Sequence, residues 1–230
     1  MTQIKTGVAA LAAIAALASC GNDDPGANPT AGNDEPTTTS STPPADYNLV
    51  PDESGPIAAG PWAVRAQGLP DAPLAVLDVP EGFYGEGPFV WTNKARIGYW
   101  NPGGVYENPC SDSGVAPSAG DTVEDLAAAL RAQELTTTTR PVRVSLDGHN
   151  GLYLEMTAPA DLDVEKCRDG VLSLWEEAPL FHDEPAVERF WILDVDGQRV
   201  VLDIGGPAAA TDEAVRLFTG IVATATFVEG

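Results

Sequence analysis

Apolar and polar positions alternate along several short segments of the chain, which predicts a domain built mainly from β-strands. Residues 73–79, 88–92 and 95–100 are rich in β-branched and aromatic side chains and are separated by Gly and Pro, a pattern typical of short strands joined by turns. A loop rich in Gly, Pro and Ser follows over residues 101–120. Residues 227–228 predict one more strand.

Two segments show helical spacing instead. The first covers residues 121–134, where Asp121 is placed to cap a helix and Glu124 to complete a capping box. The second begins after Thr211, which is its predicted cap. The apolar face of the first helix is Val123, Leu126, Ala127 and Leu130, and that of the second is Val215, Phe218 and Val222. Both faces predict helices that pack on a sheet.

Two hairpins are predicted between these helices. In the first, we expect one apolar set to face the other across the strands, with a loop at 148–150. The two sets are Val142, Val144 and Leu146, and Leu152, Leu154 and Met156. The second hairpin turns at Asp196-Gly197 and sets Leu193 opposite Val200. Its strands are apolar on both faces, which is typical of the middle of a covered sheet. The pattern therefore predicts an α+β fold with an antiparallel sheet flanked by two or more helices.

The N-terminal segment predicts export. Residues 8–18 are an uninterrupted apolar run of 11 residues, which is short of the roughly 20 that a membrane-spanning helix needs and fits a signal-peptide core. The run ends in Leu17-Ala18-Ser19-Cys20, which resembles the bacterial lipobox. This resemblance implies removal of residues 1–19 and diacylglycerol on the Cys20 thiol. We therefore expect a lipid-anchored protein on the outer face of the cell membrane, with the bilayer as its partner.

A flexible tether is expected between the anchor and the domain. Gly, Asn, Asp, Pro, Thr or Ser occupy 22 of the 26 positions in residues 21–46, a composition that cannot bury enough apolar surface to order itself. We place the lipidated Cys and tether at residues 20–56 and a single globular domain at residues 57–230.

The remaining cysteines suggest a disulfide. Cys110 and Cys167 are left after lipidation of Cys20, and outside the cytoplasm two such thiols can oxidise. Two free thiols are the alternative. Neither residue has a second Cys or a His at metal-ligand spacing, so no metal site is expected there.

Charge narrows the choice of partner. The formal net charge is −22, which excludes nucleic acid, since phosphate binding needs clustered Lys and Arg. Anionic lipid headgroups would also repel the domain. Attachment to the membrane is therefore expected through acyl chains alone.

Aromatic side chains are concentrated in residues 83–106, which hold seven of the chain's sixteen. Trp91, Tyr99, Trp100 and Tyr106 are the candidate ligand-binding residues of this region. Exposed, they would stack on a glycan or cover a lipid. The alternative is that they form the core of the sheet.

Groups for catalysis are scarce. The chain has two His: His149 on a predicted hairpin tip, and His182 beside Asp183 and Glu184. A hydrolase would need one of them next to a Ser or a carboxylate, and no Gly-x-Ser-x-Gly elbow is present. We expect a binding or scaffolding module with no cofactor, not an enzyme. Its partner would be an envelope protein, glycan or lipid. The alternatives are a lipid or glycan carrier using residues 83–106, and a hydrolase using His149 or His182.

The order of elements resembles a known family. A strand over residues 79–83, the helix at 121–134, the turn at 146–151, the hairpin at 191–201 and a closing helix are similar to the PsbP-like fold, including the LpqN-type lipoproteins of actinobacteria. The resemblance spans about residues 73–228 and implies an α/β/α sandwich around an antiparallel sheet. It supplies no catalytic residues.

Overall fold

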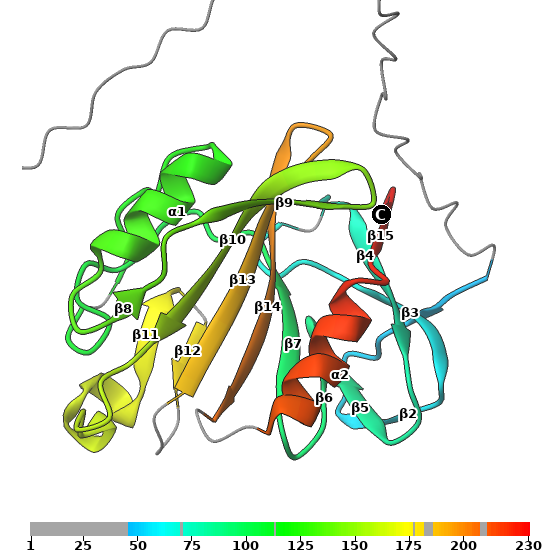
Figure 1. The fold of residues 1–230 in the computed structure, drawn as a ribbon, viewed down its shortest axis with the longest axis horizontal. Coiled ribbons are helices and arrows are strands. Elements are labelled where there is room, and N and C mark those ends of the chain that lie inside the picture. Colours follow the sequence, from blue (N-terminus) through cyan, green and yellow to red (C-terminus); the bar gives the residue numbers. More distant parts are fainter. Residues whose placement is uncertain (1–45, 70, 113, 177, 182–185, 208–210) are drawn as a thin grey trace, which may run out of the picture. The chain divides into compact units, whose positions relative to one another are not determined.

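The computed structural model describes residues 46–69, 71–112, 114–176, 178–181, 186–207 and 211–230. Cys20 and His182 therefore lie outside the described residues. No helix of this described part is both long enough and apolar enough to cross a membrane. The structure is mixed α+β, with large antiparallel sheets and two α-helices within the described residues (Figure 1).

A nine-stranded sheet forms the centre of the domain. Its strands, in spatial order, are β2 (Gly55–Ile57), β5 (Phe83–Glu86), β6 (Phe89–Trp91), β7 (Arg96–Trp100), β14 (Gln198–Pro207), β13 (Ala186–Val195), β10 (His149–Thr157) and β8 (Thr137–Thr138), with β9 (Val142–Leu146) also paired to β10. Every neighbouring pair is antiparallel. The ten-residue strands β13 and β14 lie in the middle, as their two apolar faces predict.

Two smaller sheets accompany the central one. The four-stranded sheet has the order β1 (Asn48–Leu49), β3 (Gly60–Val64), β4 (Leu74–Val79) and β15 (Thr226–Val228). Its β1–β3 pair is parallel and the others are antiparallel. The second is a hairpin of β11 (Leu172–Trp175) and β12 (Ala178–Phe181). Two short 3-10 turns, Val164–Lys166 and Arg168–Gly170, precede it.

The two helices cover opposite faces of the central sheet (Figure 1). Helix α2 (Asp212–Val222) packs through Phe218 on the face that carries Leu202, together with the four-stranded sheet. Helix α1 (Val123–Ala132) packs through Leu126 on the face that carries Val201, together with β11. Successive strand residues point to opposite faces, so β14 contributes to both cores.

The face of α1 is as predicted, since Val123, Leu126, Ala127 and Leu130 are buried. That of α2 is as predicted at Phe218 and Val222, but Val215 is only half-buried, and Ala214 and Ile221 are buried with the other two. One cap also differs. The cap of α1 is Thr122 in place of Asp121, and Asp125 completes the capping box in place of Glu124. A Thr hydroxyl serves the same role as an Asp carboxylate, and the shift puts Val123 in the first turn. Thr211 caps α2 as predicted.

The Asp196-Gly197 hairpin is confirmed, with Leu193 opposite Val200. The first hairpin is wrong in register: Leu146 pairs with His149, and the two-residue turn is Asp147-Gly148. Both turn residues have positive φ, 48° and 80°, as a tight hairpin turn requires. The shift is an odd number of residues, so the two apolar sets lie on opposite faces. Val144 and Leu146 pack against one core and the second set against the other, whereas Val142 is exposed.

Other boundaries also differ. Strands β4, β6 and β7 match the predictions, but residues 79–83 are not one strand, because Val79 ends β4 and Phe83 begins β5. The last part of the expected tether is folded. Strand β1 lies within residues 46–56, strand β2 begins there and ends at Ile57, and Val50 is buried. Pairing with β3 and β5 gives these residues the backbone partners and apolar contacts that their composition alone does not supply.

The disulfide is confirmed. Cys110 and Cys167 are joined, with their Cα atoms 4.5 Å apart. The bond ties the long loop after β7 to the 3-10 turn at Val164–Lys166, beside the α1 core. The Arg168 N–H donates to the Cys110 carbonyl at 2.8 Å and reinforces the same junction.

Candidate functional site

A cavity of about 540 Å³ opens at the end of β7. It is lined by residues from four segments of the chain, 67–68, 100–104, 115–118 and 175–176, and is called here the Trp100 pocket. Its volume is in the range of small-molecule sites. A pocket made by four loops and strand ends depends on the surrounding fold to hold them in place.

Two indoles form part of its wall. The rings of Trp100 and Trp175 meet edge to face, with centroids 5.8 Å apart and planes at 75°. Both side chains are almost fully buried, at 2% and 3% exposure, so each presents only a small part of its surface to the cavity. Trp175 Nε1 is buried and has no acceptor within the described chain.

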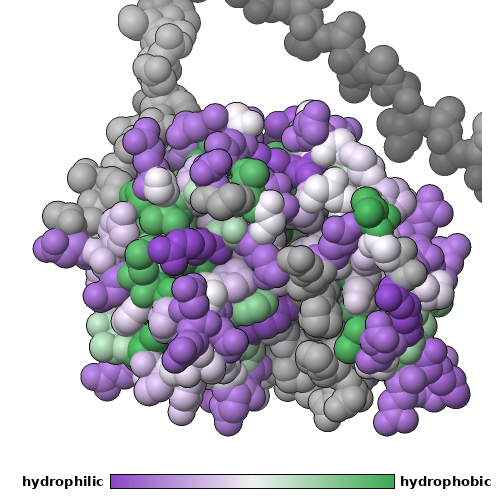
Figure 2. Space-filling model, turned by 180° about the vertical axis from the view of Figure 1, so that it is seen from behind, coloured by the Kyte–Doolittle hydropathy of each residue, from purple (hydrophilic) through white to green (hydrophobic). Residues whose placement is uncertain are grey.

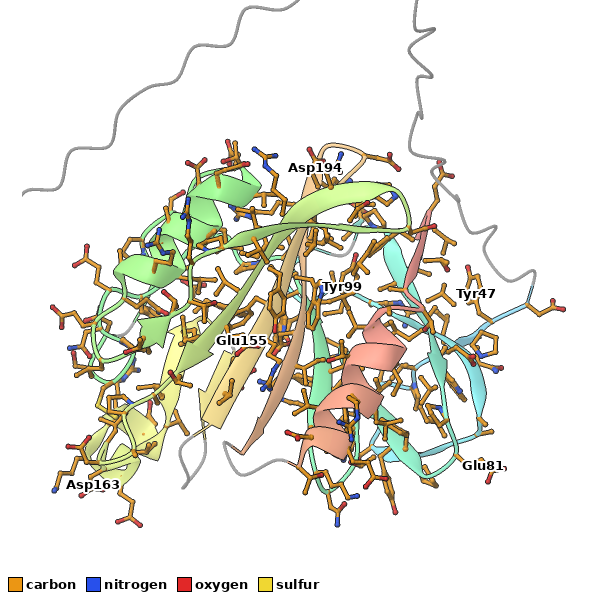
Figure 3. All side chains as sticks on the ribbon, in the orientation of Figure 1. Tyr47, Glu81, Tyr99, Glu155, Asp163 and Asp194 are labelled. Carbon is orange, nitrogen blue, oxygen red and sulfur yellow. A yellow bond between two sulfur atoms is a disulfide. The ribbon has the colours of Figure 1, made fainter. Side chains whose placement is uncertain are left out.

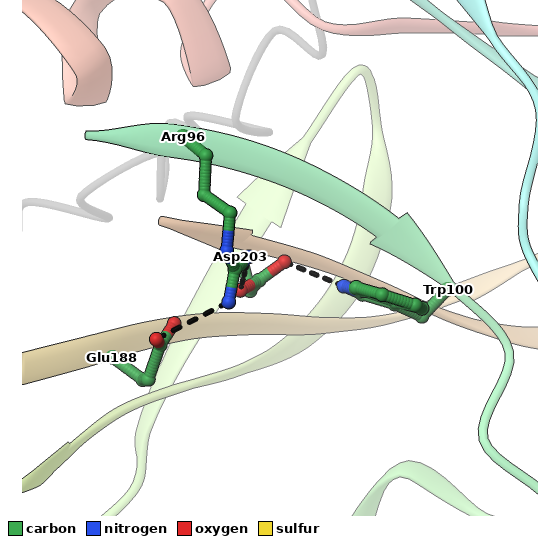
Figure 4. Close-up of polar contacts among 4 residues, drawn as sticks. All are labelled: Arg96, Trp100, Glu188 and Asp203. Atoms are coloured by element: carbon green, nitrogen blue, oxygen red, sulfur yellow. Dashed lines mark hydrogen bonds and ion pairs between the residues drawn. The ribbon is translucent and has the colours of Figure 1, made fainter. Parts of the chain in front are cut away.

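A buried network fixes the orientation of Trp100 (Figure 4). Its Nε1 donates to Asp203 Oδ1 at 2.6 Å. Arg96 Nη1 donates to Asp203 Oδ2 at 2.6 Å, and Arg96 Nη2 to Glu188 Oε1 at 3.2 Å. Both carboxylates are fully buried. The indole is therefore held at the pocket through a charge-assisted chain that crosses β7, β14 and β13.

Two glycines make room for this network. A Cβ at Gly98 would lie 2.3 Å from Asp203 Oδ1 and 2.5 Å from Trp100 Nε1. A Cβ at Gly205 would lie 2.6 Å from Glu188 Oε1. Both positions are on the face of the sheet that carries the network, so the absence of a side chain there allows two carboxyl groups and an indole to meet.

The network holds more acid than base. Burial raises the pKa of Glu188 well above its ordinary value, although Arg96 opposes the shift, and the neighbouring Asp203 raises that pKa further. For Arg96, burial alone would lower the pKa, but attraction to Asp203 and Glu188 outweighs it and raises the pKa. One cation and two carboxyl groups are neutral together when Glu188 keeps its proton.

Backbone contacts hold the pocket walls. Gly68 has φ of 91°, and a Cβ there would lie 2.9 Å from the Asn101 carbonyl oxygen. A Cβ at Gly104 would lie 2.5 Å from the carbonyl oxygens of Ala116 and Pro117. The Ala116 N–H donates to the Glu176 carboxylate at 2.8 Å. These close approaches fix the loops against one another.

Arg199 ties this pocket to helix α1. Its Nη2 donates to the Pro102 carbonyl and its Nη1 to the Gly120 carbonyl, each at 2.5 Å. Burial lowers the pKa of Arg199, although Asp121 and Asp125 oppose this effect. The side chain also lines a second cavity of about 410 Å³ at the start of α1.

The second cavity is charged. Its wall carries acidic and basic side chains together: Asp121, Glu124, Asp194, Arg143 and Arg199.

Within the described part of the chain, no group of three His, Cys, Asp or Glu side chains is placed to hold a metal ion. On the face shown in Figure 2, the described hydrophobic residues form separate small groups among hydrophilic ones.

The four predicted aromatic residues do not form one surface. Tyr99 is fully buried on the α2 face (Figure 3). Its hydroxyl donates to the Pro73 carbonyl at 2.8 Å. Tyr106 is buried, with its hydroxyl on the Gly114 carbonyl. Trp100 lines the pocket described above. The remaining residue, Trp91, is partly exposed and stacks on Tyr84, with ring centroids 6.1 Å apart.

His149 is not brought to this site, and His182 lies outside the described residues. His149 is half-buried at the start of β10, and its ring meets Phe227 edge to face, with centroids 5.4 Å apart. No hydrogen bond or ion pair joins it to a Ser or a carboxylate within the described residues.

Sequence reasoning missed Trp175, Arg199 and the three charged residues of the network. One signal was present: Glu188 has the same strand parity as Phe190 and Ile192, and Asp203 the same as Val201. Alternation therefore puts each carboxyl on a covered face of the sheet. Charged residues at such positions are rarely buried unless they are paired.

A scan against protein-family models finds no match, and a search of curated proteins finds none either. Function is therefore inferred from the geometry of the domain and from its residues.

Proposed function

We propose that the chain is a lipid-anchored binding protein on the outer face of the cell membrane, and that the Trp100 pocket is its ligand site. The observation that carries the proposal is the network of Asp203, Arg96 and Glu188 behind Trp100. It fixes an indole at the wall of a cavity of about 540 Å³. Fixed side chains at a cavity favour binding, because less freedom is lost when the ligand arrives.

The cost of the network supports a role beyond stability. Removing two carboxyl groups and a guanidinium from water is expensive, and apolar residues of similar size often stabilise a core as well or better. The glycines at 98 and 205, whose missing side chains make room for the network, also cost stability, because Gly in a strand loses more conformational freedom on folding than other residues. An arrangement that costs stability in this way is typical of sites that position a functional group.

The anchor rests on the lipobox-like sequence that ends in Cys20. Acyl chains on this residue would hold the domain at the bilayer. The net charge of −22 would not, because anionic headgroups repel a negatively charged domain. The Cys110–Cys167 disulfide is the kind of bond that persists outside the cytoplasm. Both features favour an extracytoplasmic, membrane-attached protein.

We also propose that the domain has the PsbP-like α/β/α sandwich. The supporting observation is that α1 and α2 pack on opposite faces of one antiparallel sheet. An experimental structure compared with members of that family tests this assignment, and a different strand order in the central sheet would contradict it.

Native mass spectrometry tests the binding function. The full chain is purified in detergent from its own membranes, and we expect it to carry a small bound molecule. Gly103→Phe should reduce the bound fraction, since Gly103 lines the pocket and a Cβ there meets open space. The matched control is Gly55→Phe on edge strand β2, where a Cβ also meets nothing. Equal occupancy of the two variants would contradict the assignment of the pocket.

A further inference from the structure

The lining of the Trp100 pocket is almost uncharged. Glu176 is its one ionisable side chain among the described residues, and no Lys, Arg or His lines it. The chain as a whole carries −22. An anionic ligand would therefore meet repulsion and no counter-charge in this cavity. The second cavity differs, because acidic and basic side chains both line it.

The polar groups of the pocket combine donors with acceptors. The Asn101 side-chain amide has no hydrogen-bond partner within the described chain, and an amide offers one acceptor oxygen beside two N–H donors. Ser118 adds a hydroxyl and Glu176 a carboxylate. Adjacent hydroxyl groups of a sugar both donate and accept, so they can pair with such groups at once.

The apolar part of the wall includes two indoles beside Pro102, Val115 and Ala116. Trp100 and Trp175 contribute indole surface, which suits the C–H face of a sugar ring, and an indole also offers one N–H. Trp175 Nε1 is an enclosed donor without an acceptor.

We infer that the Trp100 pocket binds a neutral oligosaccharide, a short segment of an uncharged envelope glycan. The inference rests on the proposed function and names the ligand class of the same site. It combines a lining with one carboxylate and no cationic side chain among the described residues, the unpaired Asn101 side-chain amide and the two indoles. The loops that approach closely at Gly68 and Gly104 hold these groups in place before the ligand arrives.

Isothermal titration calorimetry of the full chain in detergent tests the inference. The probes are neutral oligosaccharides of glucose, mannose, galactose and arabinose, with an oligogalacturonate and a medium-chain fatty acid as comparators. At least one neutral series should bind, and the two anionic comparators should not. Asn101→Ala should weaken that binding by roughly five-fold, the loss expected for one or two hydrogen bonds.

The matched control is Asn150→Ala, which removes the same amide from the second cavity and should leave the affinity unchanged. Two results would overturn the glycan inference: no binding of any neutral series, or equal effects of the two Asn variants. If the native mass spectra still show a bound molecule that Gly103→Phe removes, the binding function stands and only the ligand class is wrong. Circular dichroism confirms that each variant is folded.

Discussion

Replacing Arg96 by Met should destabilise the domain much more than replacing Arg189 by Met, although both residues pair with a carboxylate on the same sheet. The Arg96 side chain is 22% exposed and contacts Asp203 and Glu188, both at 0%. The Arg189 side chain is 17% exposed, but its partner Glu155 is 37% exposed and 3.5 Å away. The two arginines therefore differ mainly in the burial of their partners.

The magnitude follows from what each substitution leaves behind. Without Arg96, the Asp203 carboxylate keeps the Trp100 hydrogen bond but loses its counter-charge in a fully buried position. Removing one partner of a buried pair costs about 3–5 kcal/mol. Without Arg189, the exposed Glu155 stays in contact with water, and such pairs contribute at most about 1 kcal/mol.

Urea unfolding near neutral pH measures both losses, followed by far-UV circular dichroism and fitted with a common slope. The expected result is a loss for Arg96→Met at least about 2 kcal/mol larger than for Arg189→Met. Equal losses, or a loss for Arg96→Met below about 1 kcal/mol, would refute the reasoning that the buried Asp203 carboxylate needs Arg96 as its counter-charge.

Four further predictions concern the network, the disulfide and the anchor. Folding raises the pKa of Glu188. The protonated Glu188 side chain therefore stabilises the folded state fully when the pH is below the pKa of the unfolded state, and this stabilisation is lost as the pH rises through the pKa of the folded state. Wild-type stability should therefore fall relative to Glu188→Gln as pH rises from about 5 to about 9, and a constant difference across denaturation curves would count against this. Gly98→Ala should displace the Trp100 indole, visible as an altered near-UV circular dichroism band beside unchanged far-UV signal, whereas an unchanged near-UV band would contradict the close packing. Reducing the disulfide, whose cysteines are 57 residues apart, should lower the melting temperature by roughly 10 °C, and an identical melting curve would argue against a structural role. Cys20→Ser should release the chain from membranes, and its recovery in a salt-washed membrane pellet would contradict lipid anchoring.

Local rules predicted the elements whose partners lie nearby in sequence. The Asp196-Gly197 hairpin was placed in its correct register because a favoured turn and alternation agree there. At Asp147-Gly148 the same dipeptide makes the turn, but equal apolar patterns on the two strands suggested a shared face. Both faces of this sheet are covered, so alternation alone could not identify which apolar set faces which core.

The pocket depends on contacts that sequence patterns do not report. Trp175 reaches Trp100 only because β11 packs across the central sheet, beside a loop that the disulfide ties down. The burial of Asp203 was open to prediction from strand parity, but its pairing with Arg96 required the order of strands β7 and β14. The roles of Gly98 and Gly205 follow from distances between residues on neighbouring strands.

Nuclear magnetic resonance of the indole N–H groups tests the central claim most directly, because each of the five Trp residues gives one signal. Neutral oligosaccharides released from the envelope of the organism that makes the protein are added to the isotope-labelled full chain in detergent. The account predicts that the Trp100 and Trp175 signals shift while that of Trp91, which stacks on Tyr84, stays in place. A shift of the Trp91 signal with Trp100 and Trp175 unchanged would contradict it and place binding on the exposed aromatic pair.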